Sequence, residues 1–314
     1  MQVNQPLVTI GIPTYNRADG RLGDAINCAL SQTYPNIEII IADNCSSDNT
    51  TEFVTALNND KIRYIRHETN IGPINNFNSC LDNAKGEYFL LFHDDDAIDS
   101  DFIEYCMASL QGRENIGMIR TGIRIIDTDN NVRSEFRNNS SGLTAAEFFL
   151  SWFNEKTVLY LPCTLFSTEK LKENGGVRSP YDMFCDVFAD AKLVAKYDRI
   201  DLPEVKASFR RHDKNYGSSA RHVMAWSQDS LALVELLCDL MPEEEKRLRK
   251  EGFRFLCLKC YHQTRKMDSP LMQRLFMYIK LKKLFAGAYP LWAFLRIYEV
   301  RPILGPIKRK LLGN

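Results

Sequence analysis

The segment His93-Asp94-Asp95-Asp96 directly follows an apolar run at residues 88–92. Folding alone does not favour a buried strand that ends in three adjacent carboxylates, because like charges repel and each needs a cation or hydrogen-bond donors to stay ionised. Clustered carboxylate oxygens suit Mg²⁺ or Mn²⁺, and these ions in turn bind phosphates. The segment therefore predicts a divalent-metal site. A solvated acidic turn before a helix capped by Asp99 or Ser100 explains the same residues.

Two further polar clusters each follow a predicted strand. They are residues 13–17 (Pro-Thr-Tyr-Asn-Arg) and the pair Asp43 and Asn44. Because the carboxyl ends of parallel strands meet at one edge of a sheet, both clusters and segment 93–96 would line one cleft. Tyr15 offers a flat face for a base, and Asp43 or Asn44 offers hydrogen-bonding groups for a base edge or a ribose. The three clusters together predict a nucleoside-diphosphate pocket without a Walker A or G-x-G-x-x-G loop. Taken singly, they are explained by packing and turns.

Alternating strands and helices position these clusters. The predicted strands are residues 7–12, 37–42, 62–65, 88–92, 116–126 and 159–166, and the predicted helices are 22–32, 51–57, 70–84, 144–153 and 180–197. This alternation indicates βαβ units and a Rossmann-like, mostly parallel α/β sheet flanked by helices. From about residue 222 onward the long segments have a helical pattern. We therefore expect an α/β catalytic domain at residues 1–220 and a helical C-terminal extension at residues 221–314.

Composition limits the partners and the compartment. The formal net charge is zero, so the chain as a whole offers no electrostatic support for a nucleic-acid partner. The nine cysteines are scattered and odd in number, and the N-terminus lacks the charged start and apolar core of a signal peptide. No stretch approaches the roughly 18 apolar residues of a membrane span. These features predict a cytoplasmic protein.

Five segments, in this order and at this spacing, resemble family 2 nucleotide-sugar glycosyltransferases. They are residues 8–17 (Val-Thr-Ile-Gly-Ile-Pro-Thr-Tyr-Asn-Arg), 31–35 (Ser-Gln-Thr-Tyr-Pro), 41–50 (Ile-Ala-Asp-Asn-Cys-Ser-Ser-Asp-Asn-Thr), 70–72 (Asn-Ile-Gly) and 86–96 (Gly-Glu-Tyr-Phe-Leu-Leu-Phe-His-Asp-Asp-Asp). The likeness covers about residues 5–215. It implies a GT-A fold, a Mn²⁺ or Mg²⁺ cofactor, and an inverting transfer of sugar from a nucleoside diphosphate to a hydroxyl of a glycan or lipid-linked glycan. It favours UDP, and a role in bacterial surface polysaccharide (O-antigen or capsule) biosynthesis.

The resemblance also implies roles for single residues. Residues implied at the donor nucleotide are Pro13, Tyr15, Arg17, Asp43, Asn44, Asn70, Gly72, Asp94, Arg211 and His212. Asn44 stands where many relatives carry Asp, which leaves the base open. Asp95 matches the metal-bearing acid, Asp94 is the second choice, and Asp96 gives an alternative D-x-D frame. We expect His93 beside the metal rather than on it, although imidazole also binds Mn²⁺. Arg211 and His212 would neutralise the leaving diphosphate, and a solvated basic loop is the alternative.

An inverting transfer needs a general base to deprotonate the acceptor hydroxyl. If Ser179 caps the last helix predicted for the domain, Asp182 falls in its first turn, and Asp186 and Asp190 follow on the same face at steps of four residues. In the family, an acid lies seven residues before the helix leucine that Leu193 matches, which selects Asp186. We therefore expect Asp186 as the base, Asp182 as the alternative, and Asp190 as a surface charge. An ordinary acidic helix face explains the same pattern.

The chain from Leu271 onward is basic, with nine Lys or Arg residues against one acid, Glu299. Basic helices that also carry aromatic residues suit an anionic membrane surface, so peripheral contact with the cytoplasmic face of the inner membrane is one interpretation. Packing on the catalytic domain or on a second subunit of an oligomer is the other.

Two other functions compete with sugar transfer. One is a metal-dependent nucleotidyltransferase or sugar-nucleotide hydrolase, which needs no acceptor base. The other is a non-catalytic subunit that binds a nucleotide or a carbohydrate.

Overall fold

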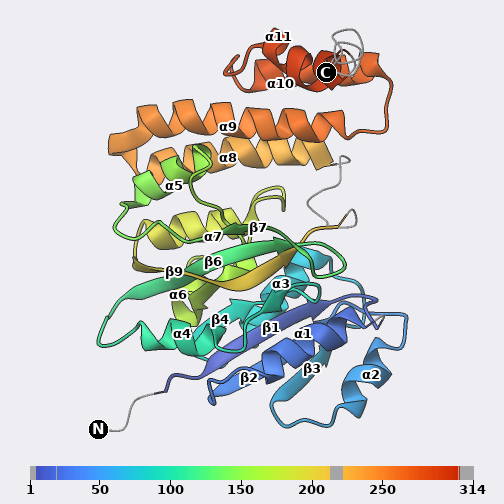
Figure 1. The fold of residues 1–314 in the computed structure, drawn as a ribbon, viewed down its shortest axis with the longest axis vertical. Helices are drawn as coiled ribbons and strands as arrows, with labels where there is room; N and C mark the ends of the chain where they lie inside the picture. Colours follow the sequence, from blue (N-terminus) through green and yellow to red (C-terminus); the bar gives the residue numbers. More distant parts are fainter. Residues whose placement is uncertain (1–4, 19, 213–221, 303, 305–314) are drawn as a thin grey trace, which may run out of the picture. The chain divides into compact units, whose positions relative to one another are not determined.

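The computed structural model describes residues 5–18, 20–212, 222–302 and 304 (Figure 1). The chain forms two compact units. The first comprises Met1–Ala145, Thr157–Arg178 and Cys185–His212, and the second comprises Ala146–Lys156, Ser179–Phe184 and Asp213–Asn314. The domain boundary predicted at residue 220 lies outside the described residues.

The first unit is built on a nine-stranded mixed sheet in the order β3-β2-β1-β4-β8-β6-β9-β5, with β7 paired to β6. The strands are β1 Val8–Thr14, β2 Ile37–Asp43, β3 Ile62–Arg66, β4 Tyr88–Leu91, β5 Ala97–Ile98, β6 Ile116–Ile126, β7 Val132–Phe136, β8 Thr164–Ser167 and β9 Asp198–Arg210. Strands β1 to β4 are parallel to one another, and β6 is parallel to β9. Thr14 pairs with Asp43, so β1 and β2 end at the same edge of the sheet.

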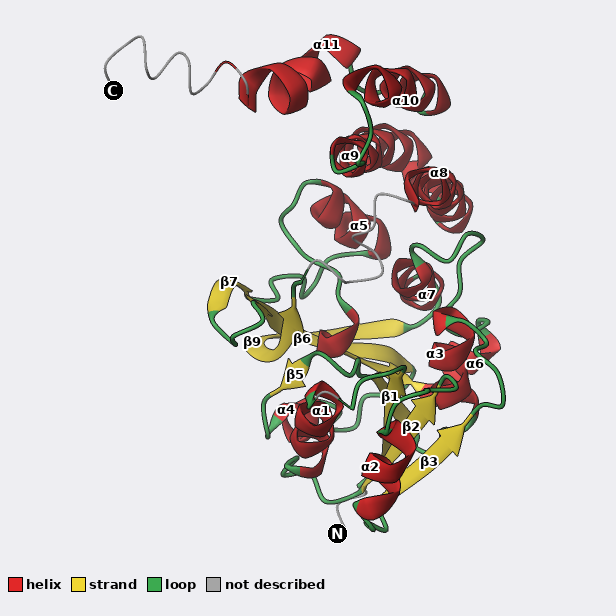
Figure 2. Ribbon diagram, turned by 90° about the vertical axis from the view of Figure 1, so that its right-hand side faces the viewer, coloured by secondary structure: helices red, strands yellow, loops and turns green. Residues whose placement is uncertain are grey.

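Helices cover both faces of this sheet. They are α1 Arg21–Leu30, α2 Thr50–Ala56, α3 Pro73–Asp82, α4 Phe102–Ala108, α6 Thr168–Glu173 and α7 Cys185–Val194, with a 3₁₀ turn η1 at Leu161–Cys163. Figure 2 shows α1 and α4 on one face and α3 and α6 on the other. Each helix turns its apolar residues to the sheet, as α1 does with Leu22, Ala25, Ile26 and Ala29. Gly11 of β1 allows α3 to pack closely, because a Cβ there would lie 2.7 Å from the Cβ of Cys80.

The second unit is helical. Its elements are α5 Ala145–Phe153, α8 Val223–Leu240, a 3₁₀ turn η4 Pro242–Glu244, α9 Glu245–Arg265, α10 Leu271–Leu284, α11 Leu291–Phe294 and a π-helical turn η5 Leu295–Val300. Aromatic rings join them: Phe184 packs edge-on against Trp152 and Trp226, and Phe255 of α9 packs against Trp152. Helices were predicted for this part of the chain, and the structure has them. Within the described residues, no helix has the length and apolarity needed to span a membrane.

The helix predicted at residues 180–197 begins only at Cys185, so the prediction of a cap at Ser179 is wrong. The reason is Asp229 of α8, which is fully buried. Its carboxylate accepts hydrogen bonds from Ser179 Oγ and from the backbone N–H groups of Tyr181, Met183 and Phe184. These bonds hold residues 179–184 in a loop.

Replacing Asp229 with Ala should release this loop. Three backbone N–H groups, one of them buried, would lose their acceptor, which costs about 3 kcal/mol of local stability. Hydrogen exchange of residues 179–184 should become much faster in Asp229→Ala. Asp239→Ala is the matched control, because Asp239 is an exposed acid on the same helix. Unchanged exchange in Asp229→Ala would contradict the role of this carboxylate.

Candidate active site

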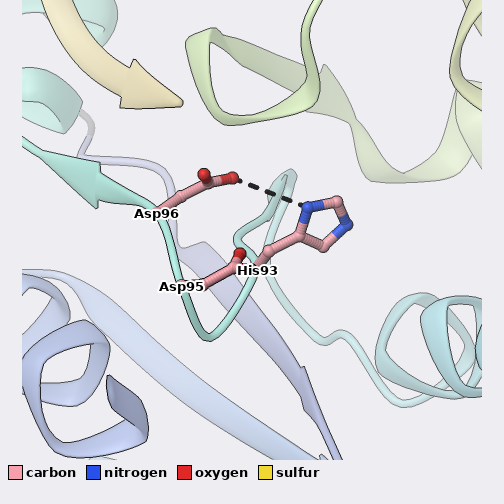
Figure 3. A group of neighbouring side chains, drawn as sticks. All are labelled: His93, Asp95 and Asp96. Carbon is pink, nitrogen blue, oxygen red and sulfur yellow. Dashed lines mark ion pairs between the residues drawn. The ribbon is translucent and has the colours of Figure 1, made fainter. Parts of the chain in front are cut away.

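Three candidate metal ligands lie together where β4 ends. Single ligand atoms of His93, Asp95 and Asp96 all lie within 4.8 Å of one another (Figure 3). The dashed line in Figure 3 marks the ion pair between His93 Nδ1 and Asp96 Oδ2, which lie 3.5 Å apart. Among the described residues, the buried His93 Nε2 has no hydrogen-bond partner, and the buried Asp96 Oδ2 has none apart from this contact with His93 Nδ1. Buried polar atoms normally have partners, so a carboxylate and an imidazole in this state fit a divalent cation such as Mn²⁺.

The charges of this cluster act on one another. Burial lowers the pKa of His93, but its hydrogen bond with Asp96 and the charges of all three acids outweigh this effect and raise the pKa to about 9. Burial raises the pKa of Asp94 to about 6, against the opposing effect of a hydrogen bond from Thr14. Burial also raises the pKa of Asp96, and the hydrogen bond with His93 opposes it. The cluster therefore holds more negative charge than its surroundings stabilise, which a bound cation would relieve.

Asp94 lies apart from the other acids and contacts the end of β1. Its Oδ2 accepts a hydrogen bond of 2.7 Å from Thr14 Oγ1. Arg17 lies between the acids, with Nε 3.6 Å from Asp94 Oδ1 and Nη2 3.9 Å from Asp95 Oδ2. Tyr15, which follows Thr14 in the chain, is 47% exposed, so part of its aromatic ring is open to solvent. The residues predicted from the first and fourth strands are thus brought together.

Asp43 and Asn44, at the end of β2, are buried and engaged by neighbours. Asp43 Oδ1 accepts hydrogen bonds from the backbone N–H and the hydroxyl of Ser46, and Oδ2 accepts one of 2.5 Å from Tyr64. Burial and this hydrogen bond raise the pKa of Tyr64 to about 12. Arg66 Nε lies 3.7 Å from Asp43 Oδ2. The sequence did not indicate Tyr64 and Arg66, because only the pairing of β2 with β3 brings them to Asp43. Ser46 was missed as well, although it lies only three residues after Asp43.

Asn44 forms hydrogen bonds with the loop that contains Asn70 and Gly72. Its Nδ2 donates to Asn70 Oδ1 at 3.0 Å, and its Oδ1 accepts from the backbone N–H of Ile71 at 2.8 Å. Asn70 Oδ1 also accepts from the backbone N–H of Gly72. The two segments that the sequence placed at the nucleoside therefore touch each other, and Asn44 acts between them.

Residues at the end of β9 close the other side of the acidic segment. His212 Nε2 lies 2.8 Å from Asp95 Oδ2. Arg210 donates from its backbone N–H to Asp96 Oδ1 and from Nε to the carbonyl oxygen of Asp95. Arg211 instead donates to Tyr160 Oη at 3.4 Å. The strand β9 was not predicted, so the role of Arg210 could not be expected.

The three candidate base residues have different surroundings. Asp186 lies in the first turn of α7, and burial raises the pKa of its carboxyl group. Asp182 is exposed and outside the helix with φ 59°, so its predicted place in the first turn is wrong. Asp190 is only 4% exposed, so the prediction of a surface charge is also wrong. Burial raises the pKa of Asp190 to about 7, although the charge of Arg120 opposes the shift.

The raised pKa of Asp190 predicts a pH-dependent stability. The folded protein holds this proton more tightly than the unfolded chain, in which Asp titrates near pH ~4. The contribution of Asp190 to the free energy of unfolding should therefore fall as the pH rises from about 4 to about 7. Wild type should lose about 3 kcal/mol relative to Asp190→Asn over this range. Urea unfolding of both proteins at several pH values measures the difference. A pH-independent difference for Asp190→Asn would contradict the prediction.

The sequence matches a known protein family. Residues 9–175 match the model of the family described as glycosyl transferase family 2. The chain belongs to glycosyl transferase family 2. The resemblance seen in the motifs is confirmed.

Two curated relatives show the extent of the likeness. An uncharacterized glycosyltransferase of Rickettsia bellii is 28% identical over 262 residues, which are 81% of this chain and 36% of that protein. The putative colanic acid biosynthesis glycosyl transferase WcaA of Escherichia coli is 40% identical over 95 residues, 30% of this chain and 34% of WcaA. The chain thus spans only about a third of the length of these relatives.

Solved structures of GT-A glycosyltransferases confirm the GT-A fold. S. aureus TarS 1–349 in complex with UDP-GlcNAc superimposes with a TM-score of 0.60 at 16% identity, over 90% of this chain and 89% of that one. The mannosyltransferase PcManGT of Pyrobaculum calidifontis, in complex with GDP-Man and Mn²⁺, superimposes with a TM-score of 0.55 at 16% identity, over 96% of this chain and 88% of that one. At these identities the likeness concerns the fold.

Proposed function

We propose that this chain transfers a sugar, with inversion, from a nucleoside-diphosphate donor to a hydroxyl of a glycan or lipid-linked glycan. The observation that carries the proposal is the cluster of His93, Asp95 and Asp96 at the sheet edge where β1, β2 and β4 end. That edge is where α/β folds bind ligands. An acidic cluster there fits a metal-bound diphosphate, and family 2 membership supplies the reaction class.

The nucleoside would lie against Tyr15, next to Asp43 and the loop fastened by Asn44. The walls of this site would include Pro13 near the end of β1 and the loop that contains Asn70 and Gly72. UDP is our choice of nucleotide, supported by the UDP-GlcNAc complex of TarS. Arg17 would stabilise the negative charge of the diphosphate, because its guanidinium already lies within 4 Å of two acids of the segment.

The metal would be held by Asp95 and Asp96, with Asp94 or His93 as a further ligand. The fit is supported by the buried His93 Nε2, which has no hydrogen-bond partner among the described residues, by the carboxylates close to it, and by the Mn²⁺ complex of PcManGT. When bound, Mn²⁺ or Mg²⁺ supplies positive charge that offsets the charge developing on the leaving diphosphate. His212 would support it from the other side of Asp95, with Arg211 contributing if it leaves Tyr160.

Asp186 would act as the general base. Its carboxylate takes the proton of the acceptor hydroxyl while the hydroxyl oxygen attacks the anomeric carbon, and the bond from that carbon to the diphosphate oxygen breaks. The raised pKa of a partly buried acid suits a base that must release its proton again. Asp182 is the alternative base.

The acceptor would belong to a bacterial surface polysaccharide, which the name of WcaA supports. A lipid-linked acceptor would bring the enzyme to the cytoplasmic face of the inner membrane. Residues 1–220 would form the catalytic domain, and residues 221–314 would form its helical extension.

Product analysis tests the reaction type. The chain is incubated with UDP-, GDP- and dTDP-sugars, Mn²⁺ and a lipid-linked glycan fraction, and the nucleotide released is identified. A sugar transferase releases the nucleoside diphosphate. Release of the nucleoside monophosphate together with the sugar phosphate would instead show hydrolysis of the diphosphate, as by a sugar-nucleotide hydrolase. Release of the sugar phosphate without free monophosphate would show transfer of the nucleotidyl group, as by a nucleotidyltransferase. Donor binding without any release would favour a non-catalytic subunit.

A further inference from the structure

Helices α10 and α11 expose large apolar side chains on their outer surface. Met272 and Phe276 of α10 are 74% and 73% exposed, and Trp292 of α11 is 66% exposed. Met272, Phe276 and Ile279 follow one another at steps of four and three residues, so they form a single stripe along α10. Such side chains normally pack inside a protein, and a group of them on the surface marks an interaction site.

The same two helices pack their other faces on α9. The ring of Tyr261 in α9 lies 5.6 Å from Tyr278 of α10 and 4.2 Å from Phe294 of α11, measured between centroids. Tyr278 and Phe294 are fully buried. Figures 1 and 2 show α10 and α11 on the side of α9 that faces away from α8. The exposed stripe therefore does not belong to the packing of the second unit.

Positive charge surrounds the apolar side chains. Lys280, Lys282, Lys283, Arg296 and Arg301 are exposed. Lys283 continues the apolar stripe, because it follows Ile279 by four residues. The one acid of residues 271–302, Glu299, is 10% exposed and pairs with Arg274 at 3.2 Å, and Tyr278 also donates to it. The acid is thus neutralised within the fold, and the exposed charge of α10 and of residues 295–302, which directly follow α11, is positive. Lys308, Arg309 and Lys310 lie outside the described residues.

We propose that the outer surface of α10 and α11 binds the anionic surface of a lipid bilayer. Phe276, Met272 and Trp292 would enter the headgroup region, and the basic residues would contact anionic lipid headgroups. A second copy of this chain fits less well, because two like-charged surfaces repel. A protein partner fits less well too, because lysine is depleted at the centre of protein interfaces. This inference rests on the proposed function, because a membrane-bound enzyme would meet its lipid-linked acceptor at the bilayer.

Vesicle flotation of the full chain, without donor or acceptor, tests the proposal. Wild type should float with vesicles that contain phosphatidylglycerol and not with pure phosphatidylcholine, and added salt should weaken the binding. Lys280→Gln/Lys283→Gln should lower the partition coefficient about tenfold or more. Met272→Ser/Phe276→Ser should lower it by a similar factor through loss of apolar contact. All four positions are exposed, so thermal unfolding should be unchanged.

Matched control variants distinguish binding by this surface from non-specific adsorption to vesicles. Lys246→Gln/Lys250→Gln removes the same charge from exposed positions at the other end of α9, and Val132→Ser/Phe136→Ser removes exposed apolar side chains of β7. Both should float like wild type. The proposal is overturned if wild type does not bind anionic vesicles, or if the control variants lose as much binding. It is also overturned if wild type is a dimer that Met272→Ser/Phe276→Ser makes monomeric. Asp95→Asn should float like wild type, so a failure of the proposed reaction leaves this test unaffected.

Discussion

Asp95→Asn should lower the rate of sugar transfer about a thousandfold. Asp95 is our first choice as metal ligand, and it lies between Arg17 and His212, which approach its Oδ2 to 3.9 Å and 2.8 Å. An amide keeps the shape of the side chain but removes the charge that a divalent cation requires. Charge stabilisation by a metal contributes several kcal/mol to a transition state, and each 1.4 kcal/mol is about a factor of ten in rate. The measurement is the initial rate of nucleoside-diphosphate release with saturating donor and Mn²⁺.

The matched control for Asp95→Asn is Asp60→Asn, at an exposed acid between α2 and β3. It should keep the wild-type rate. Circular dichroism and thermal unfolding of Asp95→Asn should show a folded protein. A folded Asp95→Asn enzyme with a rate within threefold of wild type would contradict the assignment of Asp95 to the metal.

Asp186→Asn should lower kcat between a hundredfold and ten-thousandfold, about the range of general-base catalysis, and leave KM for the donor unchanged. Within the described residues, Asp186 makes no hydrogen bond or ion pair with the residues proposed at the nucleotide, so donor binding should not depend on it. Burial raises the pKa of this carboxyl group, so the fraction in the basic form increases as the pH rises through the raised pKa. The wild-type rate should therefore climb with pH to a plateau. The residual rate of Asp186→Asn should lack this climb.

Asp182→Asn distinguishes the two candidate bases. Asp182 is exposed in the loop that Asp229 holds, and its loss should leave kcat within a few-fold of wild type. If Asp182→Asn removes activity and Asp186→Asn does not, the base is Asp182. Wild-type turnover in Asp186→Asn would fit a hydrolase or nucleotidyltransferase, which needs no acceptor base.

Much of the first unit could be predicted from the sequence, because its elements are specified locally. Strands β2 and β6 are mostly apolar, and their burial confirms that they belong to the core. Parallel strands place their carboxyl ends at one edge. For this reason Thr14 and Arg17 meet Asp94, as the order of the motifs implied.

Contacts between residues distant in the sequence could not be predicted. The start of α7 depends on Asp229, which follows Ser179 by fifty positions in the chain and leaves no local signal. Strand β9 was missed because charged residues and Pro203 interrupt its apolar pattern, although it pairs with β6 along most of its length. The interaction of Tyr64 with Asp43 likewise depends on the pairing of two strands. Asp190 was placed on the surface because helical spacing alone does not show which face of α7 meets the sheet.

The most direct test of the central claim is calorimetric titration of wild type and Asp95→Asn with UDP, GDP and dTDP, each with Mn²⁺, with Mg²⁺ and with a chelator. We predict that one nucleotide, UDP, binds wild type tightly only when the metal is present. Binding to Asp95→Asn should be weak whether or not the metal is added. Absence of metal-dependent binding by any of the three nucleotides to wild type would contradict the claim that the cluster of His93, Asp95 and Asp96 holds a metal-bound nucleoside diphosphate.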